Sequence, residues 1–205
     1  AVDGVYSSFL GYQGQKCSAC SRAIVAKEVY DEFVEKLASK CKSVKMGDVE
    51  DFDNYLGPVI NRDAFDKIMN YINIGEKEGE LIVGGNGKDN FIEPTVFKDV
   101  SPDARIAQEE IFGPVLAIIK AQDFDDALSI ANSTDYGLTG GVYTKSLEKI
   151  KKAKDEFFVG NLYFNRKCTG ALVGVQPFGG FNMSGTDAKA GGFEHLLLFV
   201  QAKSI

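Results

Sequence analysis

The stretch from Gly14 to Arg22, GQKCSACSR, contains two thiols, Cys17 and Cys20, separated by two residues. Thiols at this spacing serve as zinc ligands, as a redox pair, or as one nucleophile beside an inert neighbour. Each of these roles needs different partners elsewhere in the chain. The rest of the sequence therefore decides between them.

A structural zinc site needs four Cys or His ligands, usually as two close pairs. The remaining candidates are Cys41, Cys168 and His195, the only histidine, and none of them forms a second pair. A thioredoxin-like pair follows a strand, whereas here a strand-like segment comes after the cysteines. A Cys–His hydrolase needs a histidine base, and His195 lies in an apolar stretch typical of a buried or capping histidine. A small, inert Cys17 is the commonest role of a free cysteine, so the spacing alone leaves the choice open.

Three motifs follow one another in a characteristic order: FLGYQGQKCSACSR (9–22), EEIFGPV (109–115) and PFGGFNMSG (177–185). Together with IEPTVF and DYGLTGGVYT they resemble the aldehyde dehydrogenase superfamily over nearly the whole chain. The resemblance implies that Cys17 is the nucleophile and that Cys20 is a packing residue. It also implies that Glu110 binds the nicotinamide ribose of NAD and that Phe112 packs beside the nicotinamide. The chemistry suits a thiolate, which adds to an aldehyde and forms a thiohemiacetal that expels hydride to the nicotinamide.

A second resemblance concerns the loop GNLYFNRKCTGALVGVQPFGG (160–180), which is similar to that of the enzymes that oxidise L-glutamate γ-semialdehyde. This resemblance implies that the backbone amides of Gly170 and Ala171 bind the substrate α-carboxylate, with help from Ser18. It implies that Phe178 packs on the aliphatic chain. Oxidation of another aldehyde, such as succinic semialdehyde, and a non-catalytic remnant domain are the alternatives.

The family's general base, its asparagine oxyanion donor and its Rossmann-like NAD-binding domain are all expected upstream of Ala1. The turn GGNG (84–87) is no substitute for a dinucleotide-binding loop, because no helix pattern follows it. We therefore predict that residues 1–205 form one domain, the catalytic domain, which is inactive alone. The resemblance implies a homo-oligomer for the full-length enzyme.

The elements that must position these residues alternate between short β-rich runs and amphipathic helices. This alternation predicts an α/β fold with a largely parallel sheet and helices on both faces. The first residues are expected in a strand or loop, and the last apolar run in a strand. The expected strands are 22–26, 81–83, 95–97, 115–121, 140–144, 160–165 and 196–203; the expected helices are Tyr30–Val44, Asp63–Gly75, 124–133 and 146–158.

The composition and charge of the chain argue against nucleic acid and membrane as partners. A net charge of −6 argues against nucleic acid, and the basic stretch 145–154 has the spacing of a solvated helix face. No apolar run reaches the roughly 20 residues of a membrane-spanning helix. Four cysteines at irregular spacing predict free thiols in a reducing cytoplasm rather than a disulfide scaffold.

Overall fold

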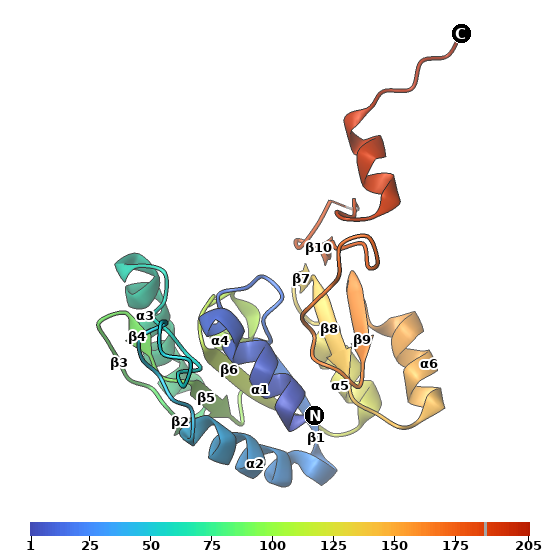
Figure 1. Cartoon of the computed structure of the whole chain (residues 1–205). Coiled ribbons are helices and arrows are strands. Elements are labelled where there is room, and N and C mark those ends of the chain that lie inside the picture. The colour runs from blue at the N-terminus through green and yellow to red at the C-terminus, as the bar shows by residue number, and fades with distance from the viewer. Residues whose placement is uncertain (187) are drawn as a thin grey trace. The chain divides into compact units, whose positions relative to one another are not determined.

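The computed structural model describes residues 1–186 and 188–205, which form two compact units. Unit 1 comprises Ala1–Ser133, coloured blue to yellow-green in Figure 1, and unit 2 comprises Thr134–Ile205, coloured yellow to red. Each unit is described by itself below. The assignment of all 205 residues to a single catalytic domain stays a prediction.

Unit 1 is built on a four-stranded sheet in the order β1-β6-β5-β2. Strands β1 (Arg22–Ala26), β6 (Val115–Ala121) and β5 (Thr95–Lys98) are parallel, and β2 (Glu80–Val83) joins the edge antiparallel to β5. The prediction of an α/β fold with a largely parallel sheet is confirmed. The predicted bounds of β1 and β6 match the observed ones.

Side chains of the central strand β6 alternate between two hydrophobic clusters. Leu116 and Ile118 enter the cluster formed with α1 (Val2–Leu10) and α2 (Tyr30–Lys42). Ala117 and Ile119 enter the cluster on the other face of the sheet. Successive strand residues point to opposite faces of the sheet, so a strand that is covered on both faces needs apolar residues along its whole length. The expectation of helices on both faces is confirmed within unit 1.

Three helices contribute to the second cluster: α3 (Arg62–Glu78), α4 (Arg105–Gln108) and α5 (Phe124–Asn132). Helix α3 begins where Asn61 accepts a hydrogen bond from the Ala64 backbone N–H at 2.9 Å. Such a cap contributes about 1 kcal/mol. The helix extends three residues beyond the predicted end at Gly75.

The N-terminal residues correct one expectation. They form helix α1 rather than a strand or loop, and this helix buries Ser8, Phe9 and Leu10. Two short 3₁₀ helices follow in unit 1: η1 (Gly11–Gly14) and η2 (Lys27–Val29). Since η1 leads into Cys17, the missed helix is the element from which the thiol-bearing loop departs.

The turn at GGNG is confirmed, with positive φ at Gly84 and Gly85. It is followed by a small hairpin of β3 (Gly87–Lys88) and β4 (Phe91–Ile92).

Two pairs of strands lie in the part of unit 2 that the structure describes. Parallel strands β8 (Thr139–Val142) and β9 (Asn161–Phe164) are joined through α6 (Leu147–Glu156), as the sequence predicted. The antiparallel pair β7 (Tyr136–Gly137) and β10 (Phe181–Asn182) was not predicted.

The predicted strand at 196–203 is wrong. Residues Phe193–Phe199 form a 3₁₀ helix, η3, which stands clear of β8, β9 and α6 in Figure 1. Its apolar side chains are largely exposed, and no strand among the described residues pairs with it. An apolar run becomes a strand only where a neighbouring strand supplies hydrogen bonds.

Among the residues that the structure describes, no helix is both long and apolar enough to span a membrane.

Candidate active site

Cys17 lies in a tight turn that follows η1. The Ala19 backbone N–H donates to the Lys16 carbonyl oxygen at 3.0 Å, so Cys17 and Ser18 are the two central residues of the turn. Cys17 is exposed, and its backbone N–H donates to no other described residue. An exposed thiol beside an unpaired amide meets two needs of a nucleophile that adds to a carbonyl: access, and a donor for the developing oxyanion.

The loop before Cys17 is fastened by backbone contacts. Gly14 adopts φ +69°, and a Cβ placed on it would lie 2.6 Å from the Gly113 carbonyl carbon and 2.7 Å from the Phe9 carbonyl oxygen. Only glycine allows both this conformation and this close approach. The first predicted motif therefore packs directly against the last residues of the second motif, EEIFGP.

Two glutamines hold the same loop to the segment 57–60. The Gln15 side-chain oxygen accepts from the Ile60 backbone N–H at 2.9 Å. The Gln13 side chain accepts from the Gly57 backbone N–H at 2.8 Å when its amide is oriented to satisfy both partners. Tyr12 and Gln13 adopt left-handed φ values of 55° and 59°, a strained conformation for residues with side chains. These contacts hold in place the backbone that immediately precedes the turn around Cys17.

The other three cysteines are less exposed than Cys17. Cys41 is only 3% exposed, and burial raises the pKa of its thiol to about 12. The Cys20 thiol is half-buried against the α1–α2 cluster, 3.4 Å from the Arg22 carbonyl oxygen. Cys168 is half-buried in unit 2. Within 1–186 and 188–205, no three His, Cys, Asp or Glu side chains gather as metal ligands do.

The two glutamates of EEIFGP have different surroundings. The Glu109 carboxylate accepts hydrogen bonds from the Tyr71 hydroxyl and from Arg105, which hold the pKa of the carboxyl at about 2, with Arg105 the larger cause. The Glu110 side chain is exposed and pairs with no other described residue. Glu109 is therefore a structural residue, and Glu110 is the one available for a ligand.

Phe112 completes this segment. It adopts φ 61° and remains 38% exposed, which is unusual for a large aromatic residue between the buried residues Ile111 and Gly113. An exposed carboxylate and an exposed aromatic ring two residues apart suit a ligand with both hydroxyl groups and a flat ring. The residues present therefore fit the nicotinamide riboside end of a dinucleotide.

In unit 2, the backbone amides of Gly170 and Ala171 donate to no other described residue. Gly170 adopts φ +94°, a conformation that favours glycine. The Arg166 guanidinium donates to the carbonyl oxygens of Thr169 at 3.2 Å and Gly170 at 3.4 Å. The carbonyls of this turn are thus occupied while two successive amides remain available, and such an arrangement binds anions.

The position of Phe178 is fixed by its neighbours. Asn161 donates to the Pro177 carbonyl oxygen at 3.0 Å and accepts from the Gly179 backbone N–H at 3.2 Å. Phe178 itself exchanges two backbone hydrogen bonds of 2.8 Å with Ala190. The side chain is half-buried at the surface of the glycine-rich loop.

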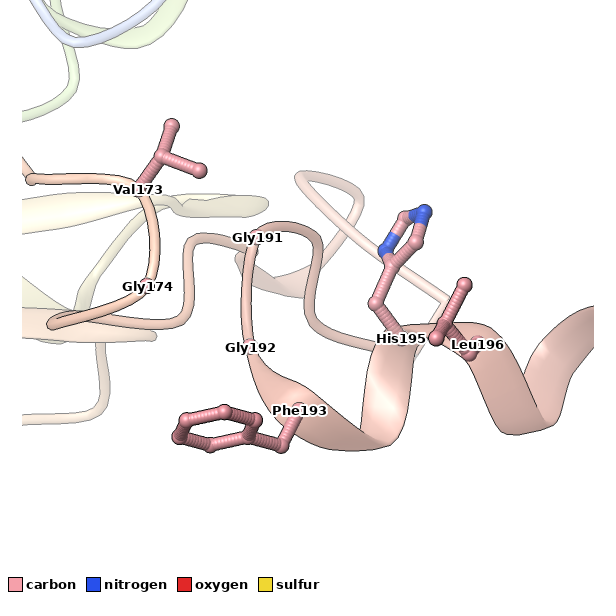
Figure 2. Close-up of a pocket in the computed structure, with 7 residues that line it drawn as sticks. All are labelled: Val173, Gly174, Gly191, Gly192, Phe193, His195 and Leu196. Atoms are coloured by element: carbon pink, nitrogen blue, oxygen red, sulfur yellow. The ribbon is translucent and has the colours of Figure 1, made fainter.

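A hollow of about 270 Å³ lies near the end of the same loop. Figure 2 shows Val173 on one rim and η3 on the other, where His195 and Leu196 point to one side and Phe193 to the opposite side. The His195 Nδ1 is 3.4 Å from the Lys189 carbonyl oxygen. The lining is almost wholly apolar, and His195 is its one titratable side chain. Its complete lining is Val173, Gly174, Gly191, Gly192, Phe193, His195 and Leu196.

The structure thus brings the predicted residues together in two groups. Cys17, Ser18, Glu110 and Phe112 belong to unit 1, through the contact between Gly14 and Gly113. Gly170, Ala171 and Phe178 belong to the glycine-rich loop of unit 2.

Several residues that hold these groups were missed by the sequence analysis. A detectable signal existed for some of them: Lys67 and Tyr71 are four residues apart on a predicted helix, and Arg105 and Glu109 have the same spacing. Asn161 and Arg166 had no such signal, because their partners are backbone atoms of an irregular loop.

The comparisons with known proteins agree with this geometry. Residues 1–205 match the sequence profile described as the aldehyde dehydrogenase family. A 1-pyrroline-5-carboxylate dehydrogenase from Bacillus subtilis (strain 168) is 59% identical over 98% of this chain and 39% of its own length. A crystal structure of 1-pyrroline-5-carboxylate dehydrogenase from Thermus with bound NAD is 51% identical with a TM-score of 0.94, over 98% of this chain and 39% of that chain. Aldehyde dehydrogenase 21 from Physcomitrella patens, in complex with the reaction product succinate, is 35% identical with a TM-score of 0.88, over 92% of this chain and 39% of that chain.

The chain spans about 40% of the length of the curated relatives that it matches. The match to the family profile nevertheless extends over the whole chain, and the solved structures share its fold. The chain belongs to the aldehyde dehydrogenase family.

Proposed function

We propose that the whole protein containing this chain oxidises L-glutamate γ-semialdehyde, the open form of 1-pyrroline-5-carboxylate, to L-glutamate with NAD. The observation that carries the proposal is the contact between Gly14 and Gly113, which joins the exposed Cys17 turn to the segment bearing Glu110 and Phe112. The names of the 51–59% identical relatives support the choice of substrate and cofactor.

In the proposed reaction, the Cys17 thiolate adds to the aldehyde carbon and forms a thiohemiacetal whose oxyanion accepts from the Cys17 backbone N–H. When bound, NAD would accept the hydride that leaves this carbon. The remaining thioester is then hydrolysed by water, which yields the carboxylate and returns the thiol. Cys17 therefore acts as the nucleophile and, in the last step, as the leaving group.

Glu110 and Phe112 are proposed to hold the nicotinamide end of NAD. The Glu110 carboxylate would accept hydrogen bonds from the ribose hydroxyls, and the Phe112 ring would pack beside the nicotinamide. We assign no general base and no side-chain oxyanion donor to this chain. Both, together with most of the NAD-binding surface, are proposed to belong to the remainder of the protein.

Substrate selection is assigned to Gly170 and Ala171, whose two unpaired amides suit an α-carboxylate, with Ser18 as a further contact. Phe178 would cover the aliphatic chain. The test is a comparison of kcat/KM for glutamate γ-semialdehyde, succinic semialdehyde and propanal in the full-length enzyme. The proposal requires glutamate γ-semialdehyde to be preferred over both others.

A preference for succinic semialdehyde would favour the second candidate function, to which the 35% identical neighbour bound to succinate points. Absence of NAD-dependent turnover with any aldehyde would favour a non-catalytic domain.

The whole protein is also proposed to be a cytoplasmic homo-oligomer. The four cysteines form no disulfide with one another, which suits a reducing compartment, and the exposed apolar side chains of η3 suit burial against another surface. Light scattering of the full-length protein tests the assembly, and a monomer at micromolar concentration would exclude it.

A further inference from the structure

One face of α3 contacts the segment Glu109–Gly113 at successive points. The Lys67 Nζ donates to the Glu110 carbonyl oxygen at 2.9 Å. The Ile68 side chain packs so closely on Gly113 that a Cβ there would lie 2.6 Å from its Cδ1 atom. Tyr71 lies four residues after Lys67 and three after Ile68, so it shares a face of α3 with each of them. A single helix therefore contacts the whole segment.

The third point of contact on α3 is Tyr71, and together with Arg105 it holds the Glu109 carboxylate by three hydrogen bonds. The Tyr71 hydroxyl donates to its Oε2 atom at 2.6 Å. Arg105 donates to Oε1 at 3.0 Å and to Oε2 at 2.9 Å, which is the paired geometry in which an arginine binds a carboxylate most specifically. The neighbouring Glu110 carboxylate has no partner among the described residues. One of two adjacent carboxylates is therefore immobilised while the other remains available.

The network is poorly placed to stabilise the fold. The Arg105 and Glu109 side chains are 55% and 42% exposed, and ion pairs at such sites contribute little to stability. Holding the backbone at Glu109, in contrast, limits the directions available to the next side chain. A side chain that is already oriented loses less conformational entropy on binding a ligand.

We infer that Tyr71, together with Glu109 and Arg105, is a positioning residue that orients the Glu110 carboxylate toward the ribose hydroxyls of the cofactor. This inference rests on the proposed role of Glu110. It assigns to α3 a part in cofactor affinity, although the tyrosine contacts the cofactor only through Glu109 and Glu110.

The test uses the full-length enzyme with Tyr71→Phe and Glu109→Gln, each nearly isosteric with the parent residue. The dissociation constant and the KM for NAD should rise roughly three- to thirtyfold, while kcat changes much less. This is less than the roughly ten- to hundredfold cost of losing a direct hydrogen bond to a charged group, because the network acts on NAD only through Glu110. The alkylation rate of Cys17 without NAD and the thermal unfolding midpoint should stay near those of the parent. Asp66→Asn is the matched control, because it breaks an exposed ion pair with Arg62 (2.8 Å) on the same helix and should leave NAD affinity unchanged.

Glu110→Gln separates this inference from the proposed function. If Glu110→Gln weakens NAD binding but Tyr71→Phe and Glu109→Gln do not, the positioning role is wrong and the role of Glu110 stands. If Glu110→Gln also leaves NAD affinity unchanged, the proposed cofactor role of Glu110 itself fails. A loss of NAD affinity that is matched by a fall in the unfolding midpoint would mean that the network only supports the fold, and would equally overturn the inference.

Discussion

Gly14 and Gly113 face each other backbone to backbone, so closely that a Cβ on Gly14 would overlap the Gly113 carbonyl group. These two glycines are 99 positions apart in the sequence, and each lies within four residues of a proposed functional side chain: Cys17 for the first and Glu110 for the second. The contact therefore fixes the position of the loop that carries the proposed nucleophile relative to the proposed cofactor-binding segment.

Gly14→Ala should displace the Cys17 turn. The new methyl group would meet the backbone of Gly113 and Phe9, and the residue would keep a φ of +69°, so unfolding free energy should fall by at least about 1 kcal/mol. Turnover of the full-length enzyme should fall with it. Gly11→Ala is the control: a Cβ there meets only the flexible Lys16 Nζ, at 3.5 Å, and should be tolerated. Equal effects of both variants, measured by urea unfolding and steady-state rate, would show that the glycine contact has no special role.

Cys17 should be the thiol most readily alkylated at neutral pH in the full-length enzyme. It is exposed, whereas burial raises the pKa of the Cys41 thiol to about 12 and Cys20 is half-buried against the core. The reactive species is the thiolate, so a buried thiol with a raised pKa reacts slowly. Limiting iodoacetamide followed by peptide mass spectrometry measures the order of labelling. Labelling of Cys20 or Cys41 before Cys17 would contradict the assignment.

Glu109→Gln should lower stability only slightly and in a pH-dependent way, because its ion pair with Arg105 is exposed. Arg105 and Tyr71 hold the pKa of the Glu109 carboxyl at about 2 in the folded protein, below its ordinary value of 4.5. A depressed folded pKa contributes stability that is present above the ordinary value and is lost as the pH falls toward the folded value. The difference in urea midpoint between parent and variant should therefore be largest above pH 4.5 and shrink as the pH falls toward 2.

Arg105→Gln should show the same pH dependence, because it removes the guanidinium that is the larger cause of the lowered pKa. A difference in midpoint that is the same at pH 5 and pH 3 in both variants would contradict the assignment.

Ala171→Leu should reduce activity selectively. A bulky side chain beside the two unpaired amides would obstruct a carboxylate, and loss of such a charge-assisted contact costs about 1.5–3 kcal/mol, or roughly ten- to a hundredfold in kcat/KM. The loss should fall on glutamate γ-semialdehyde and spare propanal, which carries no carboxylate. Leu172→Ala, a change at the exposed next residue in the loop, should affect neither substrate strongly. An equal loss on both substrates in Ala171→Leu would mean that the loop only supports the fold.

Much of the fold was predictable because its strongest elements are locally encoded. The strand Val115–Ala121 is apolar along its whole length and was predicted to the residue, as was Arg22–Ala26. Helix α1 was missed although Val2, Val5 and Phe9 recur at helical spacing. Its helical signal is weak because the segment is only nine residues long and Ala1 supplies no capping side chain.

The C-terminal error has a different origin. Residues 196–203 have the apolar character of a strand, but strand formation depends on a pairing partner that no local pattern specifies. The same limit applies to the site. The motifs indicated Cys17, Glu110 and Gly170, whereas Asn161 and Arg166 act on carbonyl oxygens whose positions depend on the folded loop.

The most direct test of the account is NADH formation from glutamate γ-semialdehyde by the full-length enzyme, measured for the parent, Cys17→Ala and Cys20→Ala. Cys17→Ala should abolish turnover while retaining NAD binding, because only the nucleophile is lost. Cys20→Ala should keep most of the parent rate, because that thiol packs against the core. Turnover that survives Cys17→Ala, or that disappears in Cys20→Ala without loss of folding, would contradict the assignment of Cys17 as the nucleophile.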